Sequence, residues 1–200
     1  MRILSLIAAS LLVTGCASMS MTPMDGLPNN MKLKPNPHGG SAQVVDSVRF
    51  DHIGAISESP AKCVAKTINN EDVKLSSTST WVGPATGNIY NSNHASDSRG
   101  GSVLLYSDDT ESVAAGREPF SFKSGIVSIQ KSADFKVSIR SEAEGYSITF
   151  FDITAAQLNS GYAPNNGYTV VGAWAGARPL DLYTALKSVD QRLATCLSGA

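Results

Sequence analysis

The sequence is poor in the side chains and motifs on which most enzyme sites depend. It contains three histidines, three cysteines and only 7% aromatic residues among its 200 residues. It has no Gly-x-Ser-x-Gly nucleophile motif, no His-Glu-x-x-His zinc motif, and neither a Walker phosphate loop nor a Gly-x-Gly-x-x-Gly fingerprint. No motif therefore points to a hydrolase, a zinc protease or a nucleotide-binding protein.

Charge is also scarce, and neither sign dominates. Lysine and arginine together number 16 against 17 aspartates and glutamates, which gives a formal net charge of -1. Proteins that bind nucleic acid or anionic lipid headgroups usually carry a clustered basic surface. Because the chain has no basic run, we expect no nucleic-acid partner.

Long apolar runs are missing as well, apart from one at the start of the chain. Ile3 to Val13 is a largely apolar stretch of eleven residues that follows a positive charge at Arg2. A transmembrane helix needs about 20 such residues, so this stretch is too short to be a comfortable span. Its length instead suits the core of a signal peptide, which predicts an exported protein.

This stretch ends in Leu12-Val13-Thr14-Gly15-Cys16, which resembles a bacterial lipobox. The resemblance covers residues 1–17 and implies that residues 1–15 are a lipoprotein signal peptide. Cys16 then becomes the first residue, and acyl chains on it anchor the protein to the lipid bilayer. Ala17 in second place favours the outer membrane under the sorting rule of Gram-negative lipoproteins. The competing interpretation is an ordinary signal peptide in which Cys16 is incidental.

A stretch rich in proline and glycine follows, and we expect residues 16–43 to be a lipidated flexible tether. A single folded domain is expected over residues 44–200. The tether also has an unusual density of methionine, with His38 downstream. Thioether sulfur binds soft cations, so Cu(I) handling is an alternative role for this stretch. Its methionines are Met19, Met21, Met24 and Met31.

If Cys16 carries lipid, two cysteines remain, Cys63 and Cys196. Extracytoplasmic compartments oxidise such pairs, so we predict a disulfide. Each cysteine also falls on the apolar stripe of a predicted helix. The first helix begins at Ser59-Pro60 and the second at Arg178-Pro179, both with proline at the first helical position.

Between the two helices the sequence alternates with the period of β-strands. Residues 135–139 and 146–150 alternate apolar and polar side chains around a turn, which predicts an antiparallel hairpin with one wet face. Further strands are expected near residues 73–81, 103–106, 120–129 and 168–174, whereas 91–101 is expected to be a polar loop and 154–158 a helical turn.

These elements predict an α+β fold. It consists of an antiparallel sheet of about five or six strands, with the two helices packed on one face and joined by the Cys63–Cys196 disulfide. Cross-linking two residues that far apart in the chain also removes conformational entropy from the unfolded state, which favours a stable domain.

The predicted polar loop holds the residues of one candidate catalytic set, namely His94, Ser96 and Asp97. A Ser/His/Asp site needs the base beside the nucleophile and an acid behind it. A second group, Tyr162, Tyr168 and Trp174, surrounds a turn and has the composition of a binding loop. Core positions in a strand are the preferred interpretation of Tyr168 and Trp174.

Together, the anchor, the tether and the disulfide favour a non-catalytic envelope lipoprotein. Such a protein is an accessory or partner-binding module at the outer membrane, and an envelope protein is its candidate partner. The alternatives are an envelope hydrolase that uses the loop around His94, and Cu(I) handling by the methionine-rich tether. No catalytic residue, metal site or cofactor is assigned from the sequence.

Overall fold

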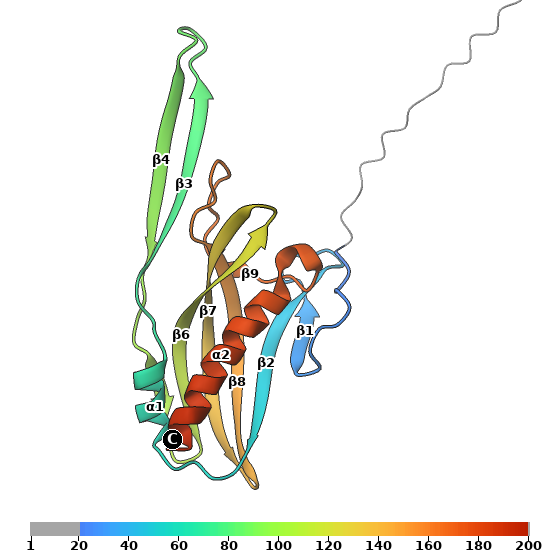
Figure 1. The fold of residues 1–200 in the computed structure, drawn as a ribbon, viewed down its shortest axis with the longest axis vertical. Helices are drawn as coiled ribbons and strands as arrows, with labels where there is room; N and C mark the ends of the chain where they lie inside the picture. The colour runs from blue at the N-terminus through green and yellow to red at the C-terminus, as the bar shows by residue number, and fades with distance from the viewer. Residues whose placement is uncertain (1–20, 200) are drawn as a thin grey trace, which may run out of the picture.

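The computed structural model describes residues 21–199, and its main feature is a seven-stranded antiparallel sheet (Figure 1). The strand order is β1-β2-β8-β7-β6-β5, with β9 paired to β8. The sheet is therefore larger than the predicted five or six strands. Its strands are β1 (Met31–Pro35), β2 (Gln43–Ile53), β5 (Leu104–Ser107), β6 (Glu111–Ser124), β7 (Val127–Glu142), β8 (Gly145–Gln157) and β9 (Thr169–Val170).

Two helices cover one face of this sheet, α1 (Pro60–Thr67) and α2 (Pro179–Leu197), as the α+β prediction requires. A single turn of 3-10 helix, η1 (Ala175–Ala177), precedes α2. The apolar stripe predicted for α2 is buried against the sheet. Its members Leu182, Leu186, Val189 and Leu193 are at most 1% exposed. Burial of that stripe, rather than helix propensity, is the main source of stability for such a helix.

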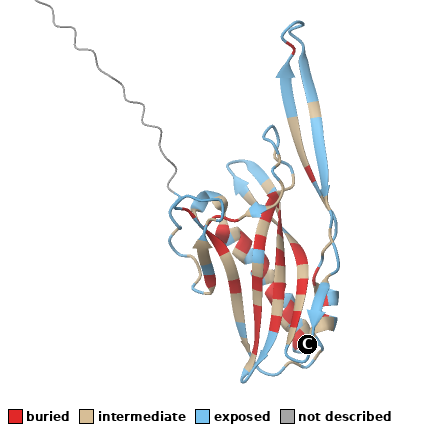
Figure 2. Cartoon of the chain, turned by 180° about the vertical axis from the view of Figure 1, so that it is seen from behind, coloured by how far each residue is buried: buried red, intermediate tan, exposed pale blue. Residues whose placement is uncertain are grey.

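The centre of the core lies where β7 and β8 face α2. The predicted hairpin over residues 135–150 is confirmed, with Val137 opposite Phe150 and Ile139 opposite Ile148. The ring of Phe150 meets Phe135 edge-on at a centroid distance of 5.2 Å. The alternation that predicted these strands therefore reflects one face buried under α2 and one face without a helix (Figure 2).

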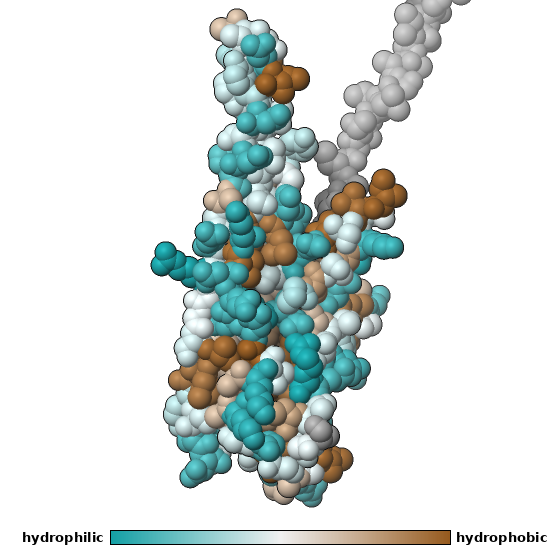
Figure 3. Space-filling view, turned by 60° about the vertical axis from the view of Figure 1, so that its left-hand side comes forward, coloured by the Kyte–Doolittle hydropathy of each residue, from teal (hydrophilic) through white to brown (hydrophobic). Residues whose placement is uncertain are grey.

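A second, two-stranded sheet stands apart from this body. Strands β3 (Val73–Val82) and β4 (Ile89–Ser98) pair with each other in an antiparallel hairpin that projects beyond one end of the large sheet (Figures 1 and 3). Residues 91–98, predicted to be a polar loop, are therefore a strand. The prediction was wrong because both faces of the hairpin are wet, so its strands lack the apolar alternation of a half-buried sheet.

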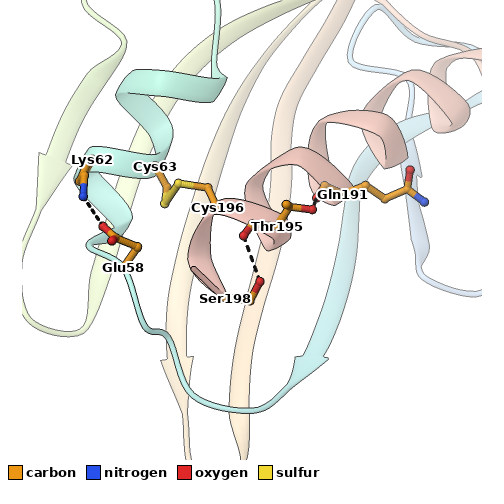
Figure 4. The surroundings of a disulfide bond; sticks show 7 residues. All are labelled: Glu58, Lys62, Cys63, Gln191, Thr195, Cys196 and Ser198. Carbon is orange, nitrogen blue, oxygen red and sulfur yellow. Dashed lines mark hydrogen bonds and ion pairs between the residues drawn. A yellow bond between two sulfur atoms is a disulfide. The ribbon is translucent and has the colours of Figure 1, made fainter. Parts of the chain in front are cut away.

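The predicted disulfide between Cys63 and Cys196 is confirmed, and it joins α1 to the last turn of α2 (Figure 4). The two Cα atoms are 5.6 Å apart. Cys63 is fully buried, whereas Cys196 is partly exposed at the edge of the core. Gly116 on β6 makes room for α1, because a Cβ atom there would lie 2.4 Å from the Ile68 side chain.

The folded region begins earlier than residue 44. Met31–Pro35 forms the edge strand β1, which pairs with β2 and places Met31 in the core. Residues 31–43 of the expected tether therefore belong to the body. The sheet, both helices and the core cluster all lie within residues 21–199. Residues 1–15 and Cys16 lie outside the described residues.

One further local prediction was wrong. Residues 154–157 continue β8 instead of forming a helical turn. Asp152 has a φ of 52°, and the register between β7 and β8 shifts at this point. This irregularity brings Ile153 and Ala155 to the core face, which breaks the period-two pattern that marks a strand. Of the last predicted strand, 168–174, only Thr169–Val170 is a strand.

Candidate functional site

The β3–β4 hairpin is the strongest candidate for a functional element, because it projects from the body and most of its length is exposed (Figure 2). Isolated two-stranded hairpins are marginally stable in water. This one must therefore be held by contacts at its base and by interactions along its own strands.

Arg117 on β6 clamps the base of the hairpin. The guanidinium is buried, and all five of its N–H groups have acceptors. Nη1 donates to the carbonyl oxygens of Glu71 and Ser98 at 3.0 and 2.7 Å, and Nη2 donates to the carbonyl oxygen of Arg99 at 2.9 Å and to the Ser98 hydroxyl at 3.1 Å. Nε donates to the Asp134 carboxylate at 2.8 Å. One side chain thus joins both ends of the hairpin to the sheet.

The loop after β8 supplies a second attachment. The N–H of Ser76 donates to the carbonyl oxygen of Leu158 at 2.8 Å, and that of Thr78 donates to Gly161 at 2.6 Å. No later residue of β3 makes a hydrogen bond to the body among the described residues. Val82 lies four residues beyond Thr78, which corresponds to about 13 Å of free strand.

Polar side chains stiffen this free part from both faces. Thr78 and Thr80 donate to the side-chain oxygens of Asn93 and Asn91 at 3.0 and 2.6 Å. On the opposite face the hydroxyl of Ser79 lies 3.3 Å from Nε2 of His94. Such cross-strand pairs each stabilise a hairpin modestly and together fix its register.

The far end of the hairpin is apolar. Trp81 stacks on its cross-strand partner Tyr90 with ring centroids 4.5 Å apart, and Val82 is paired with Ile89 on the opposite face. We call these four residues the tip cluster. All four are exposed, Trp81 by 52% and Ile89 by 70%. The six-residue turn between them is ordered by hydrogen bonds from Gly83 to Asn88 and from Gly87 to Gly83.

The structure separates the residues of the candidate hydrolase site. His94 and Asp97 lie on the same strand, three residues apart, so their side chains point to opposite faces of the hairpin. Ser96 shares a face with His94 but lies one pleat further along the strand. Within residues 21–199, the side-chain partner of His94 is the Ser79 hydroxyl, so no acid stands behind this histidine.

His94 does line a shallow cavity of about 300 Å³ between the hairpin and the loop that follows β8. Tyr162, one of the predicted binding aromatics, lines the same cavity and is 78% exposed. The other two have structural roles. The Tyr168 ring lies 5.2 Å from the guanidinium carbon of Arg117, and its hydroxyl donates to Ser132 at 2.9 Å. Trp174 is half-buried at the start of η1.

Burial raises the pKa of the Tyr168 hydroxyl above its usual value. The phenol therefore stays protonated over the physiological range and keeps its hydrogen bond to Ser132. Because the same ring lies against the buried Arg117 guanidinium, Tyr168 supports the clamp of the hairpin and not a binding loop.

The methionines of the expected tether do not form one flexible cluster. Met31 is buried in the core, whereas Met21 is exposed, and Met19 lies outside the described residues. His38 makes a turn with Asn36 after β1. Among the described residues, no group of three or more histidine, cysteine, aspartate or glutamate side chains is arranged to hold a metal ion.

Sequence reasoning missed the tip cluster, although a signal for it exists. Trp81-Val82 and Ile89-Tyr90 are mirror images around the Gly83 to Asn88 turn. Such symmetry of apolar pairs around a glycine- and proline-containing turn is typical of a hairpin. Each apolar pair alone is too short to be assigned to a strand.

Neither helix in residues 21–199 combines the length and the apolar character needed to cross a membrane. Comparison of the chain with protein-family models, with curated proteins and with solved structures found no match.

Proposed function

We propose that this protein is a non-catalytic envelope lipoprotein that is anchored in the outer membrane through Cys16 and acts as an accessory binding module. The observation that carries the binding role is the tip cluster, an exposed aromatic and aliphatic group on a stiffened, projecting hairpin. Aromatic residues of this kind are enriched at the centres of binding surfaces. The anchor is inferred from the lipobox resemblance and the pairing of the other two cysteines.

The arrangement of His94 favours a binding role over the hydrolase alternative. A histidine that acts as a general base needs an oriented acid on one ring nitrogen and a nucleophile on the other. The Asp97 side chain points away from His94 across the strand. Burial of Met31 in the core leaves the copper alternative with Met19, Met21 and Met24, of which Met19 lies outside the described residues.

The anchor is tested by expressing the full chain in a Gram-negative host. We expect the wild-type protein to be recovered in outer-membrane fractions with the mass of a diacylated or triacylated cysteine. Cys16→Ser should lose both the added mass and the membrane association. Recovery of unmodified wild-type protein in the soluble periplasmic fraction would contradict the proposal.

The same preparations distinguish binding from hydrolysis. A panel of ester, amide and glycoside substrates should show no turnover that depends on His94. Turnover by the wild type that is lost in His94→Ala, with an unchanged melting temperature, would support the hydrolase alternative instead.

A further inference from the structure

The tip cluster is apolar on both faces of the hairpin. Trp81 and Tyr90 occupy one face, and Val82 and Ile89 occupy the other. A β-ribbon that docks flat on a protein surface needs apolar side chains on one face only. Apolar side chains on both faces fit an end that enters a lipid interface, where each of these side chains leaves water.

The rest of the hairpin is suited to such an environment. From Leu75 to Ser96, twenty-two residues, the chain carries no aspartate, glutamate, lysine or arginine. The polar side chains of these strands are hydroxyl and amide groups. No charged side chain must therefore be dehydrated as the tip approaches a lipid surface. Tryptophan and tyrosine are the residues that concentrate at membrane interfaces, since each combines an apolar ring with one polar group.

Some of the other exposed apolar side chains lie at the same end of the molecule, whereas Leu104, Leu105 and Tyr106 are exposed on the edge strand β5. The turn between β6 and β7, the loop after β8 and the first described residues all lie at the end from which the hairpin projects (Figure 1). Figure 3 shows apolar side chains at the far end of the hairpin and again at this end of the body. The exposed residues of these segments are Met21, Ile126, Val127 and Tyr162.

The chain also leaves the body at this end. The N–H of Met24 donates to the carbonyl oxygen of Ala173 at 2.9 Å, which fixes the start of the folded region close to η1. Only five peptide steps separate Cys16 from Met21, so their Cα atoms cannot be more than about 18 Å apart in any conformation. An acyl anchor on Cys16 therefore holds this end of the body close to the membrane surface.

From these observations we infer that the tip cluster inserts into the lipid interface of the same membrane leaflet that holds the acyl anchor. This inference rests on the proposed anchor at Cys16 and names a lipid surface as the partner of the hairpin. The protein is then held at two points, the acylated N-terminus and the hairpin tip, which fixes the orientation of the body relative to the bilayer.

A lipid surface fits the tip better than a protein does. The uncharged distal hairpin offers no charge pattern through which a protein partner would be selected. The short connection from Cys16 brings the bilayer within reach of this end whatever other partner is present. Two weak membrane contacts also reinforce each other when they are linked in one molecule.

The test uses the lipidated mature protein, purified from membranes and reconstituted into phosphatidylethanolamine and phosphatidylglycerol vesicles. Trp174→Phe leaves Trp81 as the single tryptophan. We expect its emission to shift to the blue and to be quenched by lipids with brominated acyl chains. Adding Val82→Ser and Ile89→Ser should abolish both effects while Trp81 remains as the reporter.

Ile53 supplies the matched control. It is an almost fully exposed isoleucine at the end of β2, at the opposite end of the body (Figure 1). Ile53→Ser should leave the quenching of Trp81 unchanged.

A second measurement uses residues 21–200, which contain the core cluster and the disulfide. This fragment should partition onto vesicles about tenfold more weakly when it carries the two tip substitutions.

The possible failures are distinguishable. In one outcome the protein floats with vesicles, but iodide in the water quenches Trp81 as strongly as it does in a vesicle-free solution of residues 21–200. The inference of an inserted tip is then wrong and the anchor stands. If the tip bridges to other membranes, the vesicles aggregate, which overturns insertion into the same leaflet. If the mature protein does not float with vesicles, the anchor itself is wrong, and the inference falls with it.

Discussion

Glu111 lies on the face of the sheet that no helix covers, opposite Arg140 in the register between β6 and β7. Its carboxylate accepts hydrogen bonds from the Ser138 hydroxyl and from the Arg140 guanidinium, the latter at 3.1 Å. The hydrogen bond from Ser138, followed by that from Arg140, lowers the pKa of Glu111 below its usual value. Hydrogen bonds to the ionised form thus make the charged carboxylate the favoured state in the fold.

The lowered pKa predicts a pH-dependent contribution of Glu111 to stability. A carboxylate whose pKa is depressed by folding stabilises the protein above its unfolded pKa, about 4.3, and loses that contribution as the pH falls through the folded value. Glu111→Gln should therefore lower the free energy of unfolding near pH 7 by about 1 kcal/mol or less, since the pair is partly solvated. The deficit should shrink towards pH 3.

Denaturant titrations of both proteins at several pH values measure this difference. Asp109→Asn is the charge-matched control, because it removes a carboxylate from the adjacent turn and leaves the Glu111 pair intact. A deficit for Glu111→Gln that is the same at pH 3 as at pH 7 would show that the loss comes from packing and not from the charge.

At the scale of elements, the hairpin depends on one side chain of a different sheet. Arg117→Met removes all five hydrogen bonds of the guanidinium. Three backbone carbonyls, the Ser98 hydroxyl and the Asp134 carboxylate then lose this donor. We expect a loss of about 1–3 kcal/mol of stability, because partly buried acceptors lose their partner while the apolar stem keeps its packing. Amides of β3 and β4 should exchange hydrogen faster than those of β7 and β8.

Arg99→Met is the control for this substitution. Arg99 is an exposed residue directly after β4 that contributes only its carbonyl oxygen to the clamp. The same chemical change at this position should alter stability by no more than about 0.5 kcal/mol. If Arg117→Met left the exchange rates of the hairpin at their wild-type values, the clamp would not be what holds it.

The sequence predicts those elements whose patterns are local. Helix α2 shows a stripe at spacings of three and four, and β7 and β8 alternate because one face of each is buried. The disulfide followed from the even number of cysteines left after Cys16. In each of these cases the information lies within one segment of the sequence or in the number of cysteines.

The elements that were missed are decided by distant partners. Met31 and Leu33 in β1 alternate with lysines over only four residues before Pro35, and pairing with β2 makes them a strand. The wet β4 is a strand because β3 lies beside it. Trp81 was placed on a strand from the sequence. Its stacking on Tyr90 follows from the register of the hairpin, whereas its exposure depends on where the hairpin leaves the body, which no local pattern specifies.

At the scale of the whole molecule, the disulfide joins segments 133 residues apart. α1 follows β2 and leads into the hairpin, and α2 ends the described chain. At eight residues, α1 is too short to be stable as an isolated helix. Its position depends on Cys63, Val64 and Ile68, which are buried against the sheet and α2. The disulfide therefore holds together the end of the body opposite the hairpin tip (Figure 1). It also fixes the position of α1, from which the chain leads into the hairpin.

Replacing both cysteines by serine should lower the free energy of unfolding by about 2–5 kcal/mol, because the unfolded chain regains the entropy that closure of this loop removes. The serine hydroxyl at the buried position of Cys63 would add its desolvation to that cost. Chemical denaturation of the oxidised wild type, the reduced wild type and the double variant separates the two contributions, since reduction opens the loop without introducing serine. Amides of α1 should lose protection first, while Arg117 still holds the base of the hairpin. Equal stability of the oxidised and the reduced wild type would mean that core packing alone positions α1.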